Sequence, residues 1–296
     1  MALPSELLAK LELLRIATRR VHSGRFAART RSRRLGAGID FADHRPYTPG
    51  DDLKHVDWTL YGRLEQLMIR LSEEETELPV HLLVDLSRSM DTGVGGERSD
   101  PKSRIARTSA TALAYVALCN LDQVRVWPFS SELAPPLVLP RKRSQVVRVW
   151  DHLEQLQLPP GTDLLAAVQS WVAMPHQRGV VVLISDLAAP DWDKAIDLLL
   201  HDRNDVGVVH LQTPGEHSLP LRGDRFDIED AETGEILRGV SRAELSAVRA
   251  QVRQDHVELE SWCRRRGVAL VSTVTGEPTD LEHLVLTLFR GKGLLR

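Results

Sequence analysis

The most informative segment of the chain is an apolar run that ends in one carboxylate and two hydroxyls: Val80-His81-Leu82-Leu83-Val84-Asp85-Leu86-Ser87-Arg88-Ser89. A short, continuous apolar run bounded by polar turns is typical of a strand buried on both faces. We expect this strand over residues 79–86, with an Asp-x-Ser-x-Ser turn at its carboxyl end. Open α/β sheets bind ligands just beyond the carboxyl ends of their strands. The turn is therefore the first candidate site.

Strands and helices alternate in the rest of the chain. We expect further strands at 123–129, 179–187, 206–211 and 268–274, and helices at about 103–120, 145–157, 164–172, 192–201, 241–266 and 279–290. This alternation predicts an α/β fold, a doubly wound, mostly parallel sheet with helices on both faces. Residues 221–240 interrupt it, because apolar pairs flank Glu232-Thr233-Gly234, and this pattern predicts a β-hairpin insertion.

The first 77 residues have a different character. Residues 4–22 have leucines at helical spacing, residues 23–37 are rich in Arg, Gly and Ser, and residues 67–72 alternate like a half-buried strand. Pro46, Pro49 and Gly50 are expected to break any regular element across 42–54. We predict two parts: residues 1–77, with an N-terminal helix and an extension, and residues 78–296, the α/β domain.

Charge is distributed unevenly along the chain. The formal net charge is -3, but residues 1–39 carry nine basic and two acidic side chains, which leaves the remainder strongly acidic. A basic arm can bind nucleic acid, an acidic partner or its own acidic body. We favour docking on the chain itself, because only one aromatic residue, Phe26, lies among the arginines at 25–34 and no nucleic-acid-binding motif follows. Nucleic-acid binding through this arm is kept as an alternative.

Composition excludes several classes of protein. Hydrophobic residues make up 42% and charged residues 27%, which is enough to build a sizeable core. The apolar runs are too short to span a bilayer, and the N-terminus lacks the pattern of a secretory signal. Two cysteines without a Cys-x-x-Cys motif argue against a disulfide framework or a cysteine-rich zinc site. We expect a cytoplasmic protein without a membrane span.

Two later loops supply further oxygen ligands to the site of Asp85, Ser87 and Ser89. Thr162 lies in Pro160-Gly161-Thr162-Asp163, and Asp186 ends the strand at 179–187. Hydroxyl and carboxylate oxygens suit Mg²⁺ or Mn²⁺ rather than zinc. The simpler interpretation is that Asp85 or Ser87 caps a helix. We favour the metal site, because the three segments follow one another at the expected sheet edge.

The order of these residues resembles the metal-ion-dependent adhesion site of von Willebrand factor type A domains. The preceding segment resembles the bacterial family known as domain of unknown function 58: Arg45-Pro46-Tyr47-Thr48-Pro49-Gly50-Asp51-Asp52-Leu53-Lys54-His55-Val56-Asp57-Trp58. Asp230-Ala231-Glu232-Thr233-Gly234-Glu235 also resembles that family's hairpin motif. Larger members carry N-terminal transmembrane helices, so this chain is similar to the short subgroup.

The resemblance implies a binding module rather than an enzyme. It implies that Ser87, Ser89 and Thr162 touch a Mg²⁺ or Mn²⁺ ion, while Asp85 and Asp186 hold its water ligands. It further implies a partner protein that supplies a carboxylate to the metal, and an association with a MoxR-type AAA+ ATPase in the assembly or maturation of proteins. Arg88 receives no ligand role.

Two interpretations compete with a binding module. A metal-dependent hydrolase could use the site of Asp85 and Asp186, but the sequence offers no convincing general base there. Asp51, Asp52, His55 and Asp57 could form a second site. We prefer a structural role, in which the acids cap turns and Trp58 anchors the segment on the domain.

Overall fold

The computed structural model describes residues 12, 14, 16, 43–49, 51, 53, 56–71, 79–91, 101–157, 161–213, 223–275, 289 and 293–295. The chain forms two compact units. One unit is Arg19–Glu77, and the other combines Met1–Thr18 with Leu78–Arg296. The division therefore differs from the predicted parts 1–77 and 78–296, because the first 18 residues belong with the larger unit.

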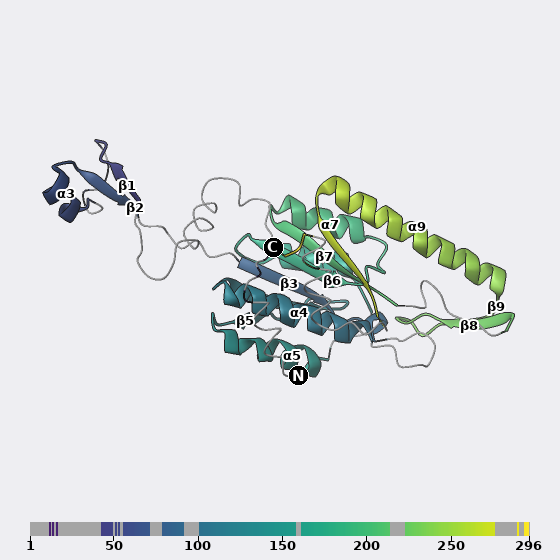
Figure 1. Cartoon of the computed structure of the whole chain (residues 1–296). Helices are drawn as coiled ribbons and strands as arrows, with labels where there is room; N and C mark the ends of the chain where they lie inside the picture. The colour runs from purple at the N-terminus through teal and green to yellow at the C-terminus, as the bar shows by residue number, and fades with distance from the viewer. Residues whose placement is uncertain are drawn as a thin grey trace. The chain divides into compact units, whose positions relative to one another are not determined.

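The larger unit is built around a six-stranded sheet (Figure 1). Its strands, in spatial order, are β10 (Ala269–Val274), β7 (Asp205–Gln212), β6 (Val180–Ser185), β3 (Pro79–Asp85), β4 (Gln123–Phe129) and β5 (Leu137–Leu139). All neighbours pair in parallel except β4 and β5, which are antiparallel. The predicted mostly parallel α/β sheet is confirmed. Every residue of β3 is buried, as its apolar run indicates.

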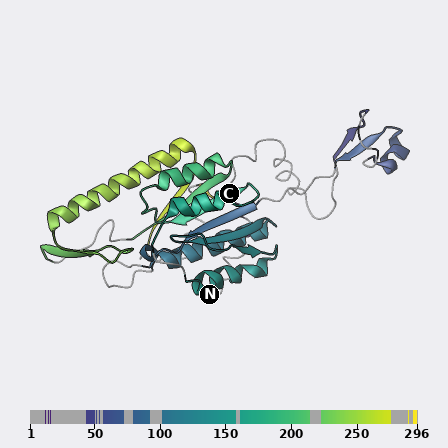
Figure 2. The same ribbon diagram turned by 180° about the vertical axis from the view of Figure 1, so that it is seen from behind.

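Helices cover both faces of this sheet (Figures 1 and 2). One face carries α4 (Lys102–Cys119) and α5 (Val147–Gln155), and the other carries α6 (Leu164–Ala173), α7 (Trp192–His201) and α9 (Arg242–Arg266). Short 3₁₀ turns, η3 (Arg88–Met90) and η4 (Arg143–Val146), follow β3 and precede α5. Each face has its own apolar core, and Phe289 and Trp171 are among the largest fully buried side chains.

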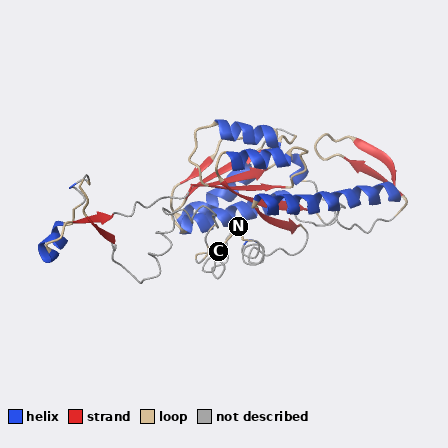
Figure 3. Cartoon of the chain, turned by 90° about the horizontal axis from the view of Figure 1, so that it is seen from above, coloured by secondary structure: helices blue, strands red, loops and turns tan. Residues whose placement is uncertain are grey.

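A separate hairpin precedes the longest helix. It consists of β8 (Arg225–Glu229) and β9 (Ile236–Ser241), paired antiparallel as a two-stranded sheet. The predicted hairpin insertion is therefore confirmed. Figure 3 shows that α9 extends past the main sheet to reach it. Ser241 begins α9 with a capping box, because its hydroxyl accepts from the Glu244 N–H and the Glu244 carboxylate accepts from the Ser241 N–H.

The smaller unit contains β1 (Asp43–Pro46), α3 (Trp58–Leu64) and β2 (Met68–Leu71). β1 and β2 pair antiparallel, so the expectation that prolines exclude any regular element from 42–54 is wrong. Pro46 is the last residue of β1, where a strand at the edge of a two-stranded sheet tolerates proline. Residues 23–37, which include most of the basic arm, lie outside the described residues.

The chain ends pack on the α4 side of the sheet. Leu14 and Ile16 are buried in the same apolar core as α4, and Ile16 forms an isolated antiparallel bridge with Leu295. A helix over residues 4–22 therefore does not run through Ile16, and most of that segment lies outside the described residues. The final helix predicted over about 279–290 also falls almost wholly outside them.

The two cysteines are free and buried on opposite faces of the sheet. Cys119 ends α4 and Cys263 lies in the last turns of α9. Burial raises the pKa of both thiols, that of Cys263 to about 12. The absence of a disulfide between them agrees with the sequence analysis.

Candidate metal and carboxylate site

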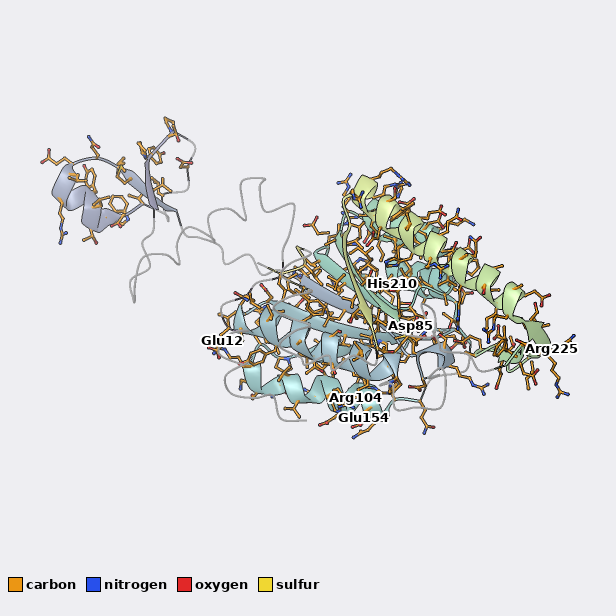
Figure 4. The ribbon with its side chains drawn as sticks, turned by 45° about the vertical axis from the view of Figure 1, so that its right-hand side comes forward. Glu12, Asp85, Arg104, Glu154, His210 and Arg225 are labelled. Atoms are coloured by element: carbon orange, nitrogen blue, oxygen red, sulfur yellow. The ribbon has the colours of Figure 1, made fainter. Side chains whose placement is uncertain are left out.

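The candidate site lies where the connections of β3 and β6 diverge. From β3 the chain passes through α4 to β4 on one side, and it later returns to β6 on the other side of β3. Ligands of open α/β sheets bind at such switch points, beyond the carboxyl ends of the strands. Asp85 is the last residue of β3 and Asp186 directly follows β6, so both predicted carboxylates belong to this edge (Figure 4 labels Asp85).

Asp85 is fully enclosed by the protein. Its Oδ1 accepts the Ser87 N–H at 2.9 Å, and its Oδ2 accepts the Ser185 hydroxyl at 2.6 Å. Burial, followed by the negative charge of Asp186, raises the pKa of Asp85 to about 6. Two carboxylates are thus brought near each other in a dry environment, and a cation between them would relieve their repulsion.

The two serines of the turn point their hydroxyls at each other. Ser87 and Ser89 are buried, and their Oγ atoms lie 3.1 Å apart because η3 folds the turn into a single 3₁₀ coil. Neighbouring ligands of an octahedral Mg²⁺, each about 2.1 Å from the ion, lie about 3 Å apart. The spacing of these hydroxyls fits one edge of such a shell.

A buried lysine shares the site. The Lys102 Nζ donates to Asp186 Oδ2 at 2.6 Å, and both side chains are buried. Asp186 Oδ1 also accepts the Ala188 N–H at 3.2 Å. Sequence reasoning missed Lys102, although a signal was present: a cation in the first turn of α4 opposes the helix dipole unless an anion lies nearby.

Thr162 reaches the site through a residue that was not predicted to belong to it. The Glu232 carboxylate, from the turn between β8 and β9, accepts the Thr162 hydroxyl at 2.9 Å through Oε1. The same Oε1 accepts the Ser89 N–H at 2.8 Å, and Oε2 accepts the Gly161 N–H at 3.1 Å. Ser89 and Thr162 are therefore brought together around a carboxylate supplied by the chain itself.

The donor set fits a hard divalent cation. The described residues contain no group of three or more His, Cys, Asp or Glu side chains that could hold a metal, so a metal at this edge would depend on hydroxyls. The Ser87 and Ser89 hydroxyls, the Asp85 and Asp186 carboxylates and the Thr162 hydroxyl are all oxygen donors, which Mg²⁺ and Mn²⁺ prefer. Lys102 supplies positive charge on the Asp186 side.

A cavity of about 550 Å³ opens beside Lys102 and Asp186. His210 and His256 also line it, with their rings stacked at a centroid distance of 5.4 Å. His210 Nε2 donates to the Asp186 carbonyl at 3.1 Å, and burial lowers the pKa of His210 to about 4, which favours a neutral ring. These contacts hold the backbone of Asp186 in place behind its carboxylate.

The acids before the α/β domain have structural roles. Asp57 caps α3, because its Oδ1 accepts the N–H groups of Thr59 and Leu60 at 3.0 Å each. Asp51 closes a turn through the Thr48 N–H and hydroxyl, both at 2.9 Å. Trp58 is the first residue of α3, and its ring lies edge-on to that of Tyr61 at a centroid distance of 6.1 Å. The expectation that it anchors the segment on the α/β domain stays a prediction. Asp52 and His55 lie outside the described residues.

Comparison with protein families identifies the chain. The family model described as "Protein of unknown function DUF58" matches residues 43–261, which is more than half of the sequence. The chain belongs to the DUF58 family. The match covers the smaller unit from β1 onward, the candidate site and the hairpin with Glu232.

Curated relatives of this DUF58 chain include "Uncharacterized protein Rv1480" of Mycobacterium tuberculosis and "Uncharacterized protein Mb1516" of Mycobacterium bovis. Each is 26% identical over 210 residues, which cover 68% of this chain. The chain spans 63% of the length of these relatives.

The solved structures that align with this DUF58 chain do so with low TM-scores. "Conserved hypothetical protein BatB" of Bacteroides thetaiotaomicron aligns with a TM-score of 0.43 and 14% identity, covering 73% of this chain and 98% of that one. An "aerotolerance-related membrane protein" of Bacteroides fragilis aligns with a TM-score of 0.36 and 16% identity, covering 59% of this chain and 87% of that one. Among the described residues, no helix combines the length and the apolar character needed to cross a membrane.

Proposed function

We propose that this chain is a non-enzymatic, Mg²⁺-dependent module that binds a carboxylate of a partner protein at the carboxyl ends of β3 and β6. The observation that carries the proposal is the position of the Glu232 carboxylate, which accepts three hydrogen bonds at 2.8–3.1 Å from Ser89, Thr162 and the neighbouring Gly161. These donors, the Ser89 and Gly161 N–H groups and the Thr162 hydroxyl, suit an anionic side chain. The von Willebrand factor A-like interpretation of the fold belongs to this proposal.

A divalent cation would be held by the Ser87, Ser89 and Thr162 hydroxyls, with Asp85 and Asp186 behind it. When bound, it supplies the positive charge that an incoming carboxylate needs. Other residues of the chain hold the two carboxylates in position. Ser185 and the Ser87 N–H orient the Asp85 carboxylate, and Lys102 fixes Asp186. The Ser87 hydroxyl lies 3.1 Å from the Ser89 hydroxyl and also bonds the Asp85 carboxylate, so both hydroxyls of the turn stay beside the carboxylate that would hold the ion.

The proposed partner is a MoxR-type AAA+ ATPase, or a client protein that such an ATPase helps to assemble, in the cytoplasm. A capture experiment tests this. Full-length protein is immobilised and exposed to lysate of the native bacterium, with Mg²⁺ or with EDTA. We expect the wild type to retain a partner only with Mg²⁺, and Asp85→Ala and Thr162→Val to lose at least nine-tenths of the retained partner, because both remove oxygen ligands of the proposed site.

Thr108→Val is the matched control for Thr162→Val, since the Thr108 hydroxyl bonds the Arg104 carbonyl of its own helix, away from the site. Calorimetric titration of each purified protein with Mg²⁺ gives a second readout that does not depend on the partner. Retention that survives EDTA, Asp85→Ala and Thr162→Val would reject the proposal.

A further inference from the structure

The turn between β8 and β9 holds its shape without using the Glu232 side chain. Asp230 Oδ1 accepts the N–H groups of Glu232 and Thr233 at 2.9 and 2.8 Å, and the Thr233 hydroxyl accepts the Glu235 N–H at 3.2 Å. Gly234 adopts a left-handed φ of 73°, which glycine reaches at low cost. The turn therefore presents the Glu232 carboxylate in a fixed position.

That carboxylate bonds two separate loops of the α/β domain. Ser89 belongs to the turn after β3, and Gly161 and Thr162 belong to the segment before α6. The Arg88 side chain lies beside the hairpin turn, since its Nη1 is 3.9 Å from the point where a Cβ on Gly234 would sit. The hairpin turn therefore lies against the turn after β3, at Arg88 and Ser89, and against the segment before α6.

The three donors that bond Glu232 can serve only one carboxylate at a time. A backbone N–H has one hydrogen to donate, and a hydroxyl also has one. The Ser89 and Gly161 N–H groups and the Thr162 hydroxyl are directed at Glu232, so a second carboxylate cannot receive the same three donors at the same time.

Apart from Val240, which is buried at its base, the described part of the hairpin is largely exposed. β8 alternates between exposed and half-buried residues, and Ile236 and Leu237 are 50% and 65% exposed. A two-stranded hairpin alone is marginally stable in water. The carboxylate contact is therefore a substantial part of what keeps the turn at the site, and its loss would release the turn.

We infer that Glu232 is an internal ligand that closes the site, and that a partner must displace it with a glutamate presented on a turn of its own. The inference rests on the proposed function, because it names the regulation and the partner chemistry of the same site. A binding-competent chain is then one in which the hairpin has moved away from Ser89 and Thr162.

The experiment compares full-length wild type with Glu232→Gln and with Glu235→Gln, a matched change of an exposed acid in the same turn. Hydrogen–deuterium exchange reports on residues 223–241. We expect Glu232→Gln to accelerate exchange in this segment at least fivefold, because the neutral amide is a poorer acceptor for three donors. Glu235→Gln should exchange like the wild type.

The second measurement uses a fluorescein-labelled peptide of residues 226–240 in buffer with Mg²⁺. We expect it to bind Glu232→Gln at least tenfold more tightly than it binds the wild type or Glu235→Gln. The same peptide carrying Glu232→Gln should bind none of them. Equal affinity for the wild type and Glu232→Gln would overturn the inference and leave the proposed function standing.

Two other results are also decisive. If the peptide binds neither protein while exchange accelerates in Glu232→Gln, the site accepts no external carboxylate, and the proposed function fails together with the competitive role of Glu232. If exchange of residues 223–241 is the same in Glu232→Gln and Glu235→Gln, Glu232 does not hold the hairpin, and the inference is wrong whatever the peptide does.

Discussion

At the scale of single residues, His81 shows how the core of the sheet restricts protonation. It lies in the middle of β3 with no exposed surface, against the rings of Trp127, Trp171 and His176. Its Nε2 lies 2.8 Å from the Gln177 carbonyl, so that nitrogen carries the proton. Trp127 donates to Nδ1 at 3.3 Å, which leaves Nδ1 as an acceptor. Burial lowers the pKa of His81 to about 4, because a charged ring would lose its hydration.

This histidine should make stability depend on pH. In the folded chain His81 stays neutral down to about pH 4, whereas the unfolded chain binds the proton near pH 6.5. The unfolded state therefore binds more protons, and stability falls as the pH falls from about 6.5 towards 4. Between pH 7 and pH 5 we expect the free energy of unfolding to drop by about 2 kcal/mol more in the wild type than in His81→Gln.

Urea denaturation followed by tryptophan fluorescence measures this difference, since Trp127 and Trp171 lie beside the ring. Comparing the two proteins at each pH cancels the other titrating groups. His201→Gln, at the exposed end of α7, is the control and should follow the wild type. Parallel pH profiles for the wild type and His81→Gln would contradict the role assigned to His81.

Residue by residue, the sequence located the polar side chains at the carboxyl end of β3 better than the side chains that contact them. Asp85, Ser87 and Ser89 are local to one strand and one turn, so their spacing alone indicated a site. Lys102 and Glu232 reach it from a helix start and from a hairpin 143 residues beyond Ser89, and local patterns carry no information about such distances. The opposition of Lys102 to its helix dipole was the one local hint.

At the scale of elements, two glycines of the sheet lie where an added side chain would meet a neighbouring atom. An added Cβ on Gly179, just before β6, would lie 2.0 Å from the Pro79 carbonyl oxygen of β3. An added Cβ on Gly207, within β7, would lie 2.4 Å from Leu294 Cδ1, the free end of a side chain. A backbone atom fixed in a strand cannot yield, whereas a leucine can change its rotamer.

The two glycines should therefore respond differently to the same substitution. We expect Gly179→Ala to destabilise the chain by about 3 kcal/mol and Gly207→Ala by about 1 kcal/mol, since overpacking costs least where a side chain can move. Denaturant midpoints at unchanged slope give both values. Equal losses would show that the β3–β6 contact adjusts as easily as a side chain.

The elements that the sequence predicted well are those with a strong apolar pattern. β4 and α7 begin and end at the predicted residues. The missed elements lack such a pattern: α3 has no buried residue, and β5 is a three-residue edge strand between Pro136 and Pro140. The helix predicted at 145–157 is divided into η4 and α5. The prolines that flank β5 made the segment look like a loop in the sequence. Proline is excluded from central strands but is tolerated at an edge strand, so its presence does not rule out a short edge strand.

At the scale of the whole molecule, the beginning of the chain is part of the α/β unit. The Asn120 side chain donates to the Leu14 carbonyl at 2.9 Å, and the Tyr115 hydroxyl donates to Glu12 at 3.2 Å. Leu14 and Ile16 are buried against the same core as Leu295. A domain boundary drawn from composition alone, at residue 77, would cut these contacts away from the sheet that they complete.

Removing residues 1–18 should therefore weaken the α/β unit. We expect a loss of about 4 kcal/mol, because two apolar side chains lose their burial and Asn120 loses a buried acceptor. Calorimetric melting of the truncated and intact chains measures it. Glu12→Gln is the control, since its ion pair with Arg143 is roughly half exposed and worth under about 1 kcal/mol. Melting that is unaffected by the truncation would contradict this account.

The enclosure of Cys119 and Cys263 has a practical consequence. Thiolates, not thiols, react with maleimides, and both native thiols are buried with raised pKa values. The two native cysteines should therefore react little with a maleimide dye, so an introduced cysteine can be labelled selectively. A single cysteine introduced at the exposed Leu237 would carry a dye on the hairpin, and its fluorescence could follow the opening of that hairpin in real time.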